Sequence, residues 1–79
     1  MEHYVATFHT HLSALLSSRS LLGAGVKARL APVPRSLSSS CGTCVLYEAE
    51  ESCLSLLDED VERVYREADG GHTMIYDNQ

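Results

Sequence analysis

Two cysteines three positions apart are the residues in this chain best suited to carry chemistry. Cys41 and Cys44 enclose a Gly-Thr pair at the end of the stretch 32–44, which opens with two prolines and continues through a run of serines. Each proline fixes φ and removes a backbone donor, and Gly42 permits a tight turn. Serine adds hydroxyls without apolar bulk, so nothing drives the stretch into a core. The pattern predicts an exposed loop whose thiols serve redox, persulfide or metal chemistry.

The three cysteines are expected to have different roles. Cys41 lies in the polar loop and is the candidate functional thiol. Cys44 enters the next apolar segment, where it is either a resolving thiol or a small hydrophobic residue. Cys53 falls on an apolar stripe and is predicted to be core.

A zinc module is an alternative interpretation. His9, His11, Cys41 and Cys44 could supply two nitrogens and two thiolates to a tetrahedral ion. However, structural zinc sites usually bring two well-spaced pairs of ligands, and His9 and His11 are more typical of an exposed strand end and a helix start. We therefore predict no bound metal and no cofactor.

Length and composition limit the function further. The 79 residues predict a single domain over 1–79, with 44% hydrophobic and 22% charged residues, as in ordinary globular proteins. A core of this size leaves little room for a substrate cavity, so we expect no enzyme. No apolar run approaches the ~18 residues of a membrane span. The start Met1-Glu2-His3-Tyr4 is unlike a secretory signal and the cysteine count is odd, so we expect a cytoplasmic protein without a disulfide framework.

Charge is distributed unevenly along the chain. Residues 1–45 carry a net charge of +3 and residues 46–79 a net charge of −8. An acidic chain is a poor nucleic-acid ligand, because that affinity comes mainly from neutralising phosphates. The acidic half is expected to be the solvated face of a helix, with an acidic docking surface as the alternative.

Periodicity predicts six elements in the order β-α-β-β-α-β. The first helix should begin after a Thr10 cap, bury Leu12, Leu15, Leu16 and Leu22, and end at Gly23 and Gly25. Apolar spacing from Cys53 to Ala68 favours a second helix, although residues 61–65 could instead form a hairpin with the last strand across Asp69-Gly70-Gly71. The expected strands are 3–8, 26–31, 43–48 and 72–77.

This order predicts an α+β, ferredoxin-like fold: a four-stranded antiparallel sheet with two helices on one face. The loop containing Cys41 would then lie at the end of the sheet where the first helix starts, near His9, Thr10 and His11. The positive end of that helix and Arg35 would favour the thiolate form of Cys41.

The sequence also resembles a known family. The segments Arg29-Leu30-Ala31-Pro32-Val33-Pro34-Arg35 and Ser38-Ser39-Ser40-Cys41-Gly42 are similar to a hallmark of small bacterial proteins called selenium/sulfur carrier-like (DUF3343). Ala31 stands where isoleucine is usual, and Cys44 where an apolar residue is more common. The likeness is strongest over residues 26–42.

This resemblance implies a carrier that holds sulfur or selenium as an adduct on Cys41. Cys44 departs from the family pattern, and its spacing from Cys41 makes it the candidate resolving thiol. Arg35, Ser40 and Gly42 would hold the cargo, and the partners would be donor and acceptor proteins. The alternative function is a non-catalytic protein-binding module, and exposed sheet edges would allow a homodimer.

Overall fold

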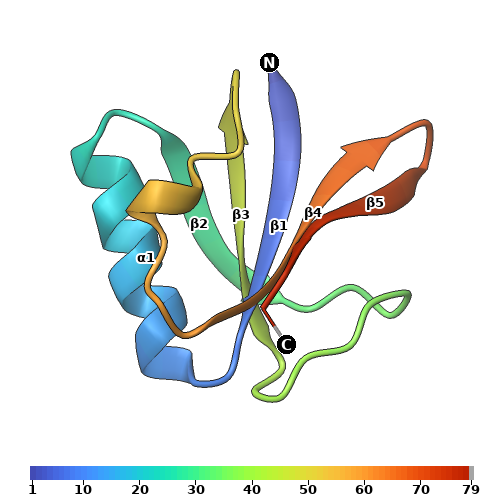
Figure 1. The fold of residues 1–79 in the computed structure, drawn as a ribbon, viewed down its shortest axis with the longest axis horizontal. Coiled ribbons are helices and arrows are strands. Elements are labelled where there is room, and N and C mark those ends of the chain that lie inside the picture. The colour runs from blue at the N-terminus through green and yellow to red at the C-terminus, as the bar shows by residue number, and fades with distance from the viewer. Residues whose placement is uncertain (79) are drawn as a thin grey trace.

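The computed structural model describes residues 1–78 and contains one five-stranded sheet and one α-helix (Figure 1). All strand pairs are antiparallel, and the strand order across the sheet is β2-β3-β1-β4-β5. The elements are β1 (Glu2–Phe8), α1 (His11–Gly23), β2 (Lys27–Pro32), β3 (Thr43–Ala49), the short 3₁₀ helix η1 (Leu54–Leu56), β4 (Val61–Ala68) and β5 (Gly71–Asp77). The α+β class is confirmed, and the order of the first four strands is compatible with a ferredoxin-like arrangement.

The predicted second helix is wrong. Residues 53–68 form η1 and β4 instead, so the sheet has five strands rather than four and carries one α-helix rather than two. The hairpin alternative is confirmed: Asp69 and Gly70 join β4 to β5 with φ of 50° and 77°. Positive φ at both central residues is what a type I′ hairpin turn requires, and Asp-Gly suits it. As a strand, β4 gains backbone pairing with β1 on one side and with β5 on the other.

The helix α1 begins and ends where the sequence predicts, but it buries the opposite face. The Thr10 side chain caps it by accepting a hydrogen bond from Ser13 N at 3.2 Å. The expected core residues Leu12, Leu16 and Leu22 are instead 61%, 45% and 54% exposed. The residues that α1 buries are Ser13, Ala14, Ser17, Ser18 and Leu21. Small residues on the inner face let the helix lie close to the sheet.

Apolar clusters lie on both faces of the sheet. The cluster beneath α1 and η1 includes Phe8, Leu21 and Val45. On the opposite face Val5, Cys44 and Tyr65 form a smaller cluster, which is covered by Val33 and Leu37 from the loop between β2 and β3. This loop therefore has a hydrophobic anchor and folds back onto the sheet.

Candidate functional site

The loop of residues 33–42, which we call the thiol loop, connects β2 to β3. Its ends are held together by a hydrogen bond from Val33 N to Gly42 O at 3.1 Å, and Leu37 N closes a turn onto Pro34 O at 3.0 Å. Because the side chains of Val33 and Leu37 pack on the sheet, the serines that follow are positioned rather than free.

Two serines attach the thiol loop to neighbouring strands. Ser39 Oγ donates to the carbonyl of Phe8 at 3.1 Å, and Ser40 Oγ donates to a carboxylate oxygen of Glu62 at 2.7 Å. Ser40 N also points to the other oxygen of Glu62, at 3.4 Å. As the strand order predicts, the thiol loop lies at the end of the sheet where α1 starts (Figure 1).

Glu62 is a buried carboxylate that the sequence analysis missed. It is 6% exposed, and the pairing of β1 with β4 skips it, since Thr7 pairs with Arg63 and Phe8 with Val61. A bulge of this kind turns a side chain out of the regular alternation. Burial alone would raise the pKa of Glu62, but the hydrogen bonds from Ser40, together with the neighbouring His9 and Ser39, outweigh it and the pKa is lowered. Glu62 therefore stays ionised and holds the thiol loop.

A second polar group joins the start of α1 to the turn before β4. Asp60 accepts hydrogen bonds from Ser13 Oγ at 2.6 Å and Thr10 Oγ1 at 3.3 Å, and the Ser13 bond is the main reason that the pKa of Asp60 is lowered. His9 lies between this carboxylate and Glu62, with ring nitrogens 3.3 Å and 3.8 Å from their oxygens. Asp60 belongs to the acidic half of the chain, which was predicted to be a solvated helix face, and instead it joins two elements.

Cys41 directly follows Ser40, which attaches the thiol loop to Glu62, and Cys41 is partly exposed. Its Sγ lies 3.4 Å from the carbonyl oxygen of Thr43, which can accept the thiol proton. The next residue, Gly42, has φ of +74°, and a Cβ placed on it would meet nothing within 4 Å. His11, at the start of α1, lies 3.4 Å from Thr43 Oγ1. The thiol is thus partly exposed and is oriented by the backbone of Thr43.

The other cysteines lie in different surroundings. Cys44 is fully buried on β3, its Sγ lies 3.6 Å from the carbonyl oxygen of Pro32, and burial raises its pKa to about 11. These surroundings favour the small hydrophobic role over that of a resolving thiol. Cys53, predicted to be core, is only partly buried, although it packs against the cluster beneath α1, and burial raises its pKa too. All three thiols are free.

The ligands of the alternative zinc site are not brought together. Within residues 1–78 no three His, Cys, Asp or Glu side chains are grouped so that they could hold a metal ion. His9 turns to Asp60 and Glu62, His11 turns to Thr43, and Cys44 is enclosed in the core. Arg35 is exposed in the thiol loop.

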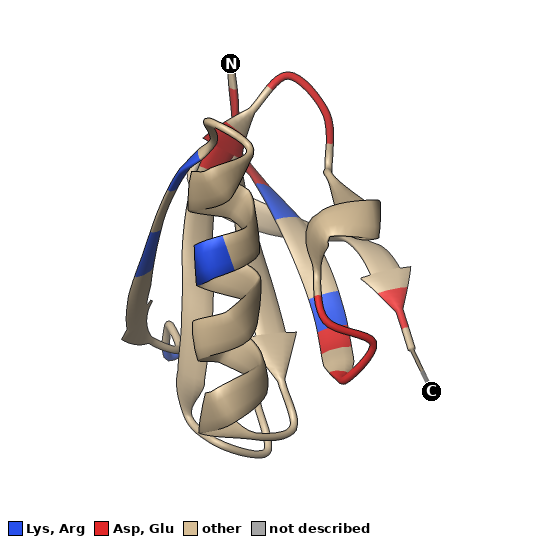
Figure 2. Ribbon diagram, turned by 90° about the vertical axis from the view of Figure 1, so that its left-hand side faces the viewer, with Lys and Arg blue, Asp and Glu red and all other residues tan. Residues whose placement is uncertain are grey.

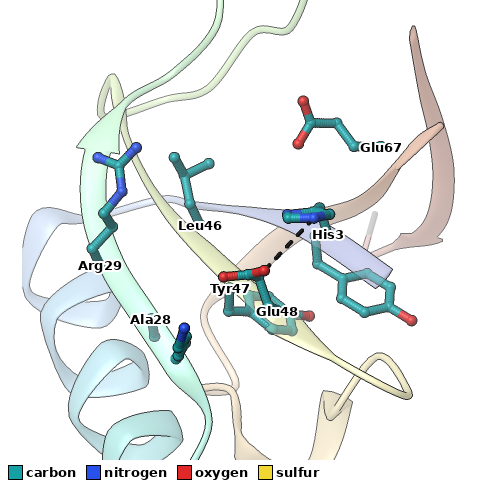
Figure 3. A pocket seen from close by; sticks show the side chains of 9 residues that line it. His3, Ala28, Arg29, Leu46, Tyr47, Glu48 and Glu67 are labelled. Atoms are coloured by element: carbon teal, nitrogen blue, oxygen red, sulfur yellow. Dashed lines mark ion pairs between the residues drawn. The ribbon is translucent and has the colours of Figure 1, made fainter. Parts of the chain in front are cut away.

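A hollow of about 470 Å³ lies on the sheet face opposite α1, away from the cysteines (Figure 3). Arg29 and Leu46 lie on one side of it and Glu67 on the other, and His3 forms an ion pair with Glu48 at 3.6 Å. No cysteine lines it, so the candidate thiol is a surface site rather than a pocket site.

The fold and the site define a small α+β protein that presents one accessible cysteine on a braced loop. Comparison with known families agrees, since residues 3–68 match the family described as "Putative Se/S carrier protein-like", and the chain belongs to that family. No curated protein and no solved structure matches the chain. No helix within residues 1–78 has the length and apolar character needed to cross a membrane.

Proposed function

We propose that the protein is a thiol carrier that accepts sulfur or selenium on Cys41 and passes it to an acceptor protein. The observation that carries this proposal is the contrast among the cysteines. Cys41 is partly exposed in a polar loop that hydrogen bonds attach to the neighbouring strands, whereas Cys44 is fully buried. Family membership supports the same cargo.

The transfer needs one thiol and no cofactor. The Cys41 thiolate attacks the terminal sulfur of a persulfide on a donor protein, and the donor's sulfur–sulfur bond breaks as the new one forms. The donor leaves as a thiolate, and Cys41 becomes a persulfide. One sulfur–sulfur bond replaces another, so no external oxidant or reductant is consumed. A selenium cargo would follow the same exchange with a selenium atom in the terminal position.

The residues around Cys41 take distinct roles in this proposal. Gly42 has a positive φ of +74°, which lets the chain turn into β3 directly after Cys41. Ser40 holds the loop, because both its hydroxyl and its amide are directed to Glu62. Arg35 is exposed in the same loop and supplies positive charge for the anionic adduct. Cys44 stays neutral beneath the loop.

Intact-protein mass spectrometry tests the proposal directly. After incubation with a cysteine desulfurase and cysteine, the protein should gain the mass of one sulfur atom, and a reductant should remove it. The adduct should be absent in Cys41→Ser and retained in the matched control Cys53→Ser. An adduct that persists in Cys41→Ser, or none in the unaltered protein, contradicts the assignment.

The alternative of a protein-binding module loses one of its proposed surfaces. The acidic helix on which that surface depended does not form, and Glu62, which lies within the stretch 53–68 predicted to form it, is buried. A pull-down in which Cys41→Ser binds partners as the unaltered protein does, with no sulfur adduct on either, would favour that alternative.

A further inference from the structure

The outer face of α1 exposes leucines that no part of residues 1–78 covers. Leu12, Leu16 and Leu22 are 61%, 45% and 54% exposed, and Leu15 between them is partly exposed. Their spacing of three, four and seven residues places them on one side of the helix, and we call this row the leucine ridge. Single exposed leucines are ordinary, but a row along one helix is typical of a contact surface.

Charges within and beside the leucine ridge are complementary. Arg19 lies on the same side of α1, is exposed, and forms no ion pair within residues 1–78. The turn of residues 58–60 carries three acidic residues and adjoins the first half of α1, where Ser17 Oγ accepts a hydrogen bond from Asp58 N at 2.8 Å. Figure 2 looks onto this side of the molecule and shows the basic position on the helix and the acidic turn beside it. Glu59 in that turn is exposed and has no ion pair within the described residues.

We propose that the leucine ridge binds the same ridge of a second copy, with the two α1 helices antiparallel. A two-fold interface must be complementary to itself. The antiparallel arrangement places Leu12 opposite Leu22 of the second copy, and brings Arg19 over the first half of the other helix, beside its acidic turn. A parallel arrangement would instead set the two Arg19 side chains against each other. The charge pattern therefore selects a second copy in the antiparallel orientation.

This dimer would leave the proposed carrier site accessible. The thiol loop lies at the start of α1, so the two loops of an antiparallel pair would be at opposite ends of the interface. It would also leave the edges of the sheet free, unlike the edge-to-edge dimer that the sequence allows. The dimer would form in the same way whatever Cys41 carries.

Sedimentation velocity under reducing conditions tests the interface. At a protein concentration on the order of 100 μM we expect a species of twice the 8.7 kDa chain mass. Leu16→Glu should weaken the dimer by about tenfold or more, because it places a charge in the ridge. Since Leu16 is exposed, the variant should keep the circular dichroism spectrum of the unaltered protein. A monomer in the unaltered protein overturns the proposal.

A charge exchange separates this interface from other dimers. Arg19→Glu and Glu59→Arg should each weaken the dimer, and the double variant should recover most of the loss. Arg29→Glu makes the same charge change on the opposite sheet face and should have no effect. A dimer that is weakened only by Arg29→Glu, or a double variant no better than the single ones, contradicts the ridge interface.

Discussion

Replacing Glu62 by glutamine should loosen the thiol loop and lower the stability of the whole domain. The carboxylate accepts from Ser40 Oγ at 2.7 Å and lies 3.4 Å from Ser40 N. Glutamine offers one acceptor oxygen and places an amide donor where the second oxygen stood. A hydrogen bond to a charged group contributes roughly 1.5–3 kcal/mol, so we expect a loss of about 2 kcal/mol in the free energy of unfolding. For a domain of this length that corresponds to a decrease in Tm of roughly 8–16 °C.

The effect of Glu62→Gln should depend on pH with a definite sign. The folded-state pKa of Glu62 is lowered, so the unfolded chain takes up protons first as the pH falls. The stabilisation by the carboxylate is therefore complete above the unfolded pKa of about 4.3, and it is lost as the pH falls through the folded-state value. Glutamine does not titrate. The stability difference between the two proteins should be largest near neutral pH and should narrow in acid.

Urea denaturation of both proteins at neutral and acid pH measures this directly. Glu50→Gln is the matched control, because Glu50 is exposed and makes no side-chain hydrogen bond or ion pair within residues 1–78. Ser40→Ala removes the same contacts from the other side, so its effect should not add to that of Glu62→Gln. A Glu62→Gln loss no larger than that of the control, or a loss that is the same in acid, would refute the reasoning.

Three further outcomes follow from the structure. Gly42→Ala forces a non-glycine residue to φ of +74° and should cost about 1–2 kcal/mol in stability by thermal denaturation, whereas Gly23→Ala, without a positive φ, should cost nothing. Leu21→Ala should lower the free energy of unfolding by about 2–5 kcal/mol because the side chain is fully buried. At a concentration where the chain is monomeric, Leu22→Ala on the exposed side should change it by no more than about 0.5 kcal/mol. Similar losses for both variants in urea denaturation would instead support the buried helix face predicted from the sequence. Cys44 should resist iodoacetamide in the folded protein and react only in urea, and rapid labelling without urea would contradict its burial.

Local signals in the sequence predicted local structure well. The Thr10 cap, the glycines that end α1 and the prolines at the end of β2 each act within a few residues, and each element begins or ends where they indicate. The prediction of a helix over residues 53–68 was wrong because the apolar spacing there fits the stripe of a helix as well as it fits a bulged strand. Pairing with β1 decided between them, and that contact is not encoded by local spacing.

The buried face of α1 could not be predicted because hydrophobic spacing alone does not identify it. Serine is unfavourable in a core unless its hydroxyl is bonded, and here the turn of residues 58–60 supplies those bonds to Ser13 and Ser17. The partners are more than 40 positions away in the chain. The same holds for the brace of the thiol loop, since Glu62 reaches Ser40 only through the bulge in β4.

The spacing of Cys41 and Cys44 suggested a dithiol pair, and the fold argues for a single working thiol instead. The two residues lie on either side of the point where the loop becomes β3, which begins at Thr43. Cys44, inside the strand, packs in a cluster that the loop itself covers, while Cys41, outside the strand, is partly exposed with its sulfur directed to Thr43 O. A resolving thiol would have to lift Val33 and Leu37 off the sheet before it could react. A carrier that passes an atom from one protein thiol to another needs no such step, so the geometry favours transfer through Cys41 alone.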